Sequence, residues 1–377
     1  MRLFILGFVF LGIMGLMNVY IYRRFLGKLG PRLSRFLIVV PLVLMLGEIL
    51  FVIEAFTHFL VESSLLYIVL SASVGVTFFL FVMAVIYDLT ITVSSKVPLD
   101  RERRRFIKVL FDITMLIAAV SYLLRGLADG LKRPGLNTVR VQIRDFPFSN
   151  YSIVQLTDIH VGQTIQRDFV QDLVDRTNQL KPDLVVITGD LVDLPISHIR
   201  QHLEPLRGLK APVYFVLGNH EYFHGVEEII AHVRELGIHP LLNDSVLIGD
   251  EQRGFDLLGI NDLSSRRMGI EPYDIESSYA KTNPARPCIL LAHQPKTIEL
   301  IEDRRCDLML SGHTHGGQIF PFGLLVMIDQ PYVAGLFQHD RDRQIFVSRG
   351  AGYWGPPLRI LAPSEISHII INSEVSA

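Results

Sequence analysis

The feature that most constrains this chain is a series of long apolar segments in its first third. Residues 3–22 carry no charge, residues 36–60 and 65–93 carry few, and residues 106–124 form a weaker fourth segment that Lys108 and Asp112 interrupt. About 20 apolar residues suffice for a helix to cross the hydrocarbon core of a bilayer. The mean hydropathy of +0.35 fits a chain of which part lies in lipid. We therefore predict a helical transmembrane region over residues 1–133, with about four spans.

Basic residues predict the orientation of these spans, because loops rich in Lys and Arg stay in the cytoplasm. Two loops are basic, one with Arg23, Arg24, Lys28, Arg32 and Arg35, and one with Lys96, Arg101, Arg103, Arg104 and Arg105. Four spans would then place the rest of the chain on the extracytoplasmic side of the cell membrane. If residues 106–124 lay in the interface instead, the rest of the chain would be cytoplasmic.

Acidic residues inside the predicted spans leave two interpretations open. Glu48 and Glu54 lie in the second segment. Carboxyl groups are costly in lipid, so they either mark a polar path or pair with side chains of neighbouring helices. Interhelical pairing is the expectation that we favour.

Charge and cysteine content exclude several classes of protein. The formal net charge is −2, and the first 133 residues hold 15 Lys and Arg against 8 Asp and Glu, so the remainder is acidic. Nucleic acid is therefore not an expected partner. Cys288 and Cys306 are too few for a disulfide-rich scaffold or a four-cysteine zinc site. Both are expected to be buried thiols, or to form one bridge if they lie on neighbouring strands.

Residues 134–377 alternate short β-rich runs with amphipathic helical stretches, which predicts an α/β domain with a β-sandwich flanked by helices. The predicted strands are 139–143, 152–156, 184–187, 213–216, 256–260, 288–292, 307–310, 344–347 and 366–371. The predicted helices are 167–180, 226–236 and 296–302.

Metal-capable side chains follow five of these strands directly, where a sheet presents its loops to a ligand. They are Asp158 and His160 (TDIH), Asp190 and Asp193 (TGDLVD), Asn219, His220 and Glu221 (GNHE), His293 (AHQP), and His313 and His315 (SGHTHGGQ). Carboxylates and imidazoles without thiolates suit Mn, Fe or Zn. The set is too large for one ion, which favours a binuclear centre of the kind used in displacement at phosphorus.

These five blocks, in this order, resemble the calcineurin-like metallophosphoesterase superfamily, over about residues 137–372. The segments GHTHGGQ and SRGAGYWGPPLRI are most similar to the membrane-associated bacterial branch of this superfamily. Protein phosphatases of the superfamily carry an arginine directly after the second aspartate of the second block, whereas Leu194 follows Asp193 here. A protein phosphatase is therefore disfavoured.

The resemblance implies a role for each side chain. The first of two divalent metals would be bound by Asp158, His160, Asp190 and His315, and the second by Asp190, Asn219, His293 and His313. A hydroxide between the ions would attack phosphorus. His220 would protonate the leaving oxygen, and Asp193 would orient His220. Glu221 is a less certain partner, and Trp354 is expected either at the rim of the site or in a core.

The leading hypothesis is a membrane-anchored metal-dependent phosphoesterase that hydrolyses phosphodiester or pyrophosphate bonds. The expected partners are the lipid bilayer and a phosphoester substrate, such as a lipid-linked phosphate of the cell envelope. One alternative is a pyrophosphatase for UDP-2,3-diacylglucosamine, whose site would need to be cytoplasmic. Another is a non-catalytic transporter or sensor module, for which Glu48, Glu54 and Asp88 are the motivation.

Overall fold

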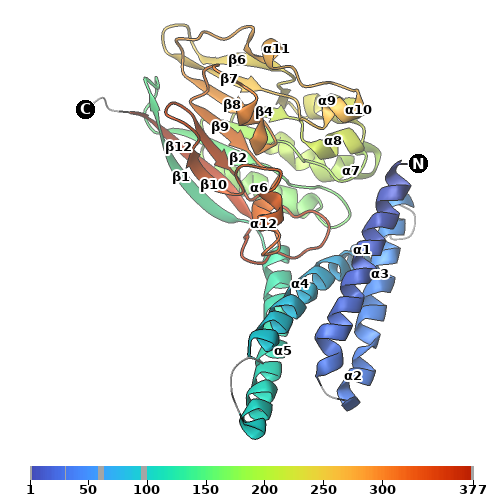
Figure 1. Cartoon of the computed structure of the whole chain (residues 1–377). Helices are drawn as coiled ribbons and strands as arrows, with labels where there is room; N and C mark the ends of the chain where they lie inside the picture. Colours follow the sequence, from blue (N-terminus) through green and yellow to red (C-terminus); the bar gives the residue numbers. More distant parts are fainter. Residues whose placement is uncertain (1, 30, 58–62, 95–99, 375–377) are drawn as a thin grey trace. The chain divides into compact units, whose positions relative to one another are not determined.

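The computed structural model describes residues 2–29, 31–57, 63–94 and 100–374, which form two compact units (Figure 1). The helical unit is Met1–Leu131 with two short later segments, Ile319–Pro321 and Gly355–Ile360. The α/β unit is Lys132–Gln318, Phe322–Trp354 and Leu361–Ala377. These two later segments lie beyond residue 133, outside the region that was predicted to be helical.

The helical unit is built from α1 (Arg2–Arg24), η1 (Leu26–Lys28), α2 (Pro31–Leu37), α3 (Val39–Thr57), α4 (Ser64–Ser94) and α5 (Arg101–Leu131). Within the described ranges, four stretches are long and apolar enough to cross a membrane: Gly7–Lys28, Leu33–Ala55, Ser64–Ser94 and Arg101–Leu131. Residues 101–105, expected in a loop, form the start of α5, since arginine is a good helix former. Residues 58–60 of the second predicted span, Glu62 in the turn after it and Lys96 lie outside the described residues.

Acidic side chains of the helical unit pair across helices. The Glu48 carboxylate of α3 is buried and accepts hydrogen bonds from Asn18 Nδ2 of α1 at 3.1 Å and Thr77 Oγ1 of α4 at 2.5 Å. Asp88 of α4 forms ion pairs with Arg24 and Lys28. For Glu48 the structure therefore shows the interhelical pairing that we favoured, and Asp88 is also paired with residues outside its own helix.

The α/β unit contains two six-stranded sheets. The first sheet has the order β1-β12-β2-β3-β4-β5 and the second β10-β11-β9-β8-β7-β6. Strands of the first sheet are β1 (Gly135–Arg144), β2 (Tyr151–Leu156), β3 (Leu184–Thr188), β4 (Val213–Val216), β5 (His239–Pro240) and β12 (Glu365–Glu374). Those of the second are β6 (Asp244–Gly249), β7 (Gly254–Gly259), β8 (Cys288–Leu291), β9 (Leu308–Ser311), β10 (Gly335–Gln338) and β11 (Gln344–Val347).

An apolar core joins the two sheets, with Ile153 and Val186 from the first and Phe255, Ile289 and Phe346 from the second. All five residues of β3 are buried, as expected of a strand covered on both faces. On its other face, the first sheet packs against three helices, α6 (Arg167–Leu180), α7 (Ile196–Leu203) and α9 (Val226–Glu235). Helix α6 buries residues 170, 173, 174 and 177, the spacing of one helical face. The predicted β-sandwich flanked by helices is confirmed.

Some elements differ from the prediction. Strands β5, β6 and β10 were not predicted, and the predicted helix 296–302 is a 3₁₀ helix, η3 (Pro295–Glu299). The remaining short helices are η2 (Glu204–Gly208), α8 (Asn219–Phe223), α10 (Ser265–Met268), α11 (Ile275–Tyr279), η4 (His315–Gly317) and α12 (Gly323–Val326). Cys288 and Cys306 are free and buried.

Parallel pairing determines where the functional loops lie. β2, β3 and β4 run parallel in the first sheet, and β8 and β9 run parallel in the second. The carboxyl ends of parallel strands share one edge of a sheet, so each sheet gathers its loops at one end.

Candidate metal centre

Loops from both sheets meet through backbone contacts. In the first sheet, the His160 amide donates to the Asp190 carbonyl at 3.1 Å. In the second sheet, the Gly312 amide donates to the His293 carbonyl at 3.0 Å. The Asp158 carboxylate, which follows β2, accepts a hydrogen bond from the His313 amide, which follows β9, at 3.0 Å. This last contact connects the ligand loops of the two sheets.

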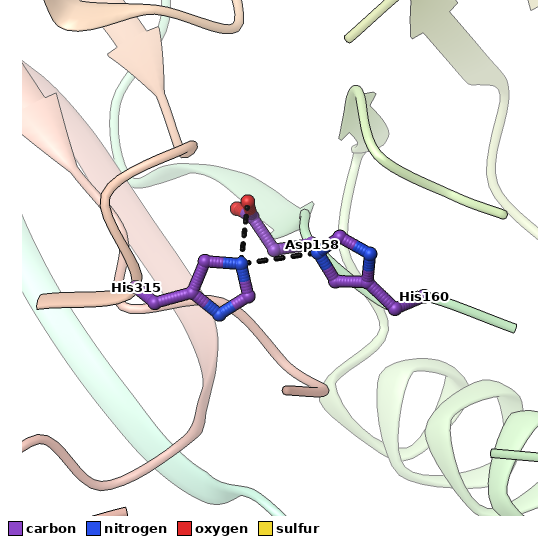
Figure 2. Close-up of side chains that lie close together, drawn as sticks. All are labelled: Asp158, His160 and His315. Atoms are coloured by element: carbon purple, nitrogen blue, oxygen red, sulfur yellow. Dashed lines mark hydrogen bonds and ion pairs between the residues drawn. The ribbon is translucent and has the colours of Figure 1, made fainter. Parts of the chain in front are cut away.

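One cluster consists of Asp158, His160 and His315 (Figure 2). His315 Nε2 lies 3.0 Å from His160 Nε2 and 3.3 Å from Asp158 Oδ1, and all three side chains are buried. His160 Nδ1 is 2.6 Å from Asp193 Oδ1, so its proton points to that carboxylate and Nε2 is left as the free lone pair. Two imidazole nitrogens facing each other beside a carboxylate are a suitable donor set for a divalent cation.

A second cluster consists of Asp190, His293 and His313. His293 Nε2 lies 3.1 Å from Asp190 Oδ2 and 3.2 Å from His313 Nδ1. His293 Nδ1 donates to the Thr188 carbonyl at 2.8 Å, which directs its Nε2 lone pair into the cluster.

Asn219 is a further candidate donor to a cation, as the resemblance implies. Its Oδ1 atom is buried and accepts no hydrogen bond from any residue that the structure describes. A buried amide oxygen without a donor is unfavourable, and a cation would satisfy it. The residues present therefore fit the expected divalent metal.

Asp190 lies between the two clusters. Its Oδ2 atom is 3.1 Å from His293 Nε2 of one cluster and 3.9 Å from His160 Nε2 of the other. Burial alone would raise the pKa of Asp190, but the nearby His293 and His220 hold it well below its usual range. An ionised carboxylate in this position suits the bridging role that the resemblance implies.

His220 lies beside Asp190 and in close contact with Asp193. His220 Nδ1 is 2.7 Å from Asp193 Oδ1, and His220 Nε2 is 4.0 Å from Asp190 Oδ2. Burial lowers the pKa of His220, but the carboxylates of Asp190 and Asp193 outweigh it and raise this pKa to about 9. His220 can therefore carry a proton at neutral pH and present it at Nε2.

Glu221 faces the backbone of two neighbouring loops. Its carboxylate accepts hydrogen bonds from the amides of Gly218, Asp190 and Leu191 at 2.6, 3.0 and 2.8 Å. It thereby holds the loop after β3 against the loop after β4. The sequence leaves the role of Glu221 open, and the structure gives it a positioning role.

Several of the predicted ligands have left-handed backbone conformations. Asp158, His160, Asp190, His313 and His315 have φ values between 50° and 70°. Residues other than glycine adopt this region at a cost, and such strain is concentrated at functional sites. The sheets and the loop contacts hold these backbones in place.

Two residues outside the predicted set also lie at the site. Asp262, which comes shortly after β7, is buried, and its Oδ1 accepts a hydrogen bond from Gln294 Nε2 at 2.9 Å. The signal was available, because Asp262 follows a predicted strand as the other acidic residues do. Gln318 is the second, and it forms two hydrogen bonds with the backbone of Trp354, at 2.9 and 3.1 Å.

Trp354 lies at the rim of the site. Its side chain is 56% exposed, and its ring centroid is 5.8 Å from that of His220. Of the two expectations for this residue, the structure shows the rim and not the core.

Comparisons with known proteins agree with this geometry. Residues 151–317 match the family model described as calcineurin-like phosphoesterase. A protein of Helicobacter pylori, described as an uncharacterized metallophosphoesterase, is 41% identical over 81% of this chain and 82% of its own length. This chain belongs to the calcineurin-like metallophosphoesterases.

Two further relatives of this metallophosphoesterase carry more specific names. A Danio rerio protein named transmembrane protein with metallophosphoesterase domain is 35% identical over 69% of this chain and 62% of its own length. An Escherichia coli protein named phosphodiesterase YaeI is 33% identical over 54% of this chain and 75% of its own length. With its apolar helices and its clusters of metal-capable residues, the chain is a membrane protein with a metallophosphoesterase domain.

Proposed function

We propose that this metallophosphoesterase is a binuclear enzyme that hydrolyses phosphodiester or pyrophosphate bonds. The observation that carries the proposal is the position of Asp190 between two donor clusters, next to a histidine that can hold a proton. Two divalent cations, with Mn, Fe or Zn as the candidates, would supply an acidified water and neutralise charge on the phosphate.

The side chains of this chain account for the remaining steps. His220 Nε2 would donate a proton to the leaving oxygen, as a general acid. Asp193 keeps the imidazole in the required orientation through Nδ1. Asp193 also lies 2.6 Å from His160 Nδ1, so one carboxylate would position both a metal ligand and the acid.

The substrate class is part of the proposal. The name of the E. coli relative supports cleavage of diesters. The apolar helices would hold the enzyme at the bilayer, which favours a lipid-linked phosphate of the envelope as the substrate. From the basic loops we further propose four spans and an extracytoplasmic site.

The test is hydrolysis of bis-p-nitrophenyl phosphate and p-nitrophenyl phosphate by the full chain in detergent after Mn loading. Diester cleavage is expected, and it should be lost in Asp190→Ala together with bound metal. His220→Ala should retain metal but lose about 10²- to 10⁴-fold in kcat, the usual contribution of a general acid.

The matched control is His198→Ala, an exposed histidine of α7, which should keep both activity and metal. No cleavage of either compound, nor of a lipid-linked or nucleotide diphosphate, by a folded chain shown to hold two metals would contradict the proposal. That result would favour the transporter or sensor module.

A further inference from the structure

An uncharged apolar stretch follows the last metal-binding loop. Residues 319–328 contain no Lys, Arg, Asp or Glu. Within this stretch, α12 buries none of its residues. Exposed fractions are 63% for Leu324, 53% for Leu325, 60% for Met327 and 81% for Ile328. We refer to residues 322–328 as the apolar turn.

The apolar turn is attached directly to the metal-binding loop. A Cβ atom on Gly317 would lie 2.5 Å from the backbone of Gly323, so the two backbones are in close contact. Gly317 comes two residues after His315, and the Thr314 hydroxyl of the same loop donates to the Val333 carbonyl at 2.5 Å. The turn is thus held next to the candidate metal centre by its own backbone.

Exposure of this turn to water is unfavourable. Helices at the surface of soluble domains bury one apolar face and expose polar residues, whereas the four residues of α12 are all apolar and none of them is fully buried. Polar residues begin directly after the apolar turn, where Asp329 forms an ion pair with Lys296 at 2.9 Å. An apolar cluster with a charged border is typical of a surface that contacts an apolar environment.

We propose that the apolar turn inserts into the interfacial region of the lipid bilayer. The chain itself indicates this occupant, since the part of it that the structure describes includes four stretches long and apolar enough to cross a membrane. The residues immediately before the turn, Ile319–Pro321, belong to the helical unit, and Ile319 is part of the apolar core of that unit. The lack of charge from residue 319 to residue 328 suits the acyl side of the headgroup region.

This inference does not depend on hydrolysis, so it is tested by lipid contact. Trp354 is the single tryptophan of the chain, and a Trp354→Phe background leaves none. Into this background we would introduce Leu325→Trp or Ile328→Trp, and Met268→Trp as the control. Met268 lies in the α/β unit and is 42% exposed, but it follows two arginines.

The full-length variants are reconstituted in phosphatidylcholine vesicles with and without dibrominated acyl chains, and metal content and circular dichroism establish that they fold. A tryptophan at position 325 or 328 is expected to lose most of its emission to the bromines, while one at position 268 keeps its emission. Equal emission at all three positions would overturn the proposal. If the emission at 325 and 328 is shifted to shorter wavelength without being quenched, protein covers the turn, for example a second copy of the chain, and the proposal is again wrong.

Discussion

Asp193 contacts two imidazoles through the same carboxylate oxygen, which lies 2.6 Å from His160 Nδ1 and 2.7 Å from His220 Nδ1. Burial would raise the pKa of Asp193, but the two imidazoles hold it well below its usual range. The resemblance implies a role for Asp193 only toward His220. The structure couples the orientation of a predicted ligand to that of the predicted acid.

Asp193→Asn is therefore expected to impair both metal binding by His160 and proton donation by His220. An amide cannot hold two imidazole protons as a carboxylate does, so we expect a loss of about 10- to 100-fold in kcat and weaker metal binding. Steady-state kinetics and metal analysis would measure the two effects. Asp175→Asn, at an exposed position of α6, should change neither. A loss of kcat with unaltered metal affinity would show that Asp193 serves His220 alone.

Gly312 is required by the close approach of the loops after β2 and β9. A Cβ atom at this position would lie 2.2 Å from both Asp158 Oδ2 and Thr157 Oγ1. Gly312→Ala should therefore displace the Asp158 carboxylate and reduce bound metal and activity together. Metal analysis of the folded variant would test this expectation.

The control for this substitution is Gly135→Ala. A Cβ atom at Gly135 would have only the Ser364 carbonyl within 4 Å, at 3.7 Å. This variant should keep its metal. If Gly312→Ala bound metal as well as Gly135→Ala does, the loop would be more adaptable than its contacts indicate.

At the scale of elements, the sequence predicted the strands that end at the candidate site because they are short, apolar and followed by polar residues. Strand 213–216 and helix 167–180 have the predicted bounds. β5 has only two residues and β10 only four, of which three are exposed, so neither has a clear apolar pattern. The division of the ligand loops between two sheets depends on long-range pairing, which local patterns do not encode.

The backbone conformations at the site could not be predicted from local sequence patterns either. Asp158, His160 and His315 adopt left-handed conformations. Such conformations are uncommon for residues other than glycine, although Asn, Asp and His adopt them more often than most, so residue type alone does not predict them. Asp262 was not predicted as a site residue, although it follows a predicted strand as the other acidic site residues do. Glu221 was predicted only as a less certain partner, because its three amide partners come from two separate loops.

Gln318 connects two of these loops, which leads to a prediction about Trp354. Gln318 Nε2 donates a hydrogen bond to the Trp354 carbonyl at 2.9 Å, and Gln318 Oε1 accepts one from the Trp354 backbone amide at 3.1 Å. Gln318→Ala should loosen this segment, lower the fluorescence anisotropy of Trp354 and raise KM more than it lowers kcat. Gln252→Ala, in an exposed turn, is the control. An unchanged anisotropy would mean that other contacts hold the segment.

At the scale of the whole molecule, the side of the membrane on which the α/β unit lies decides between the substrate classes. An extracytoplasmic unit would act on envelope phosphates, whereas a cytoplasmic unit would favour the nucleotide-linked pyrophosphatase. The two native thiols are convenient for mapping, because Cys288 and Cys306 are buried and their burial raises the pKa of both. A folded chain should therefore react slowly with maleimides until a cysteine is introduced at the surface.

Gln252→Cys, in the exposed turn between β6 and β7, should react with a membrane-impermeant maleimide in intact cells. Arg105→Cys, in the exposed basic start of α5, should react only after lysis, because basic segments remain in the cytoplasm. The unsubstituted chain measures the background. The reverse pattern, with position 105 labelled in intact cells and position 252 only after lysis, would show that the membrane topology is opposite to the predicted one. If both positions react only after lysis, α5 does not cross the bilayer, the α/β unit is cytoplasmic, and a nucleotide diphosphate becomes the substrate to test first.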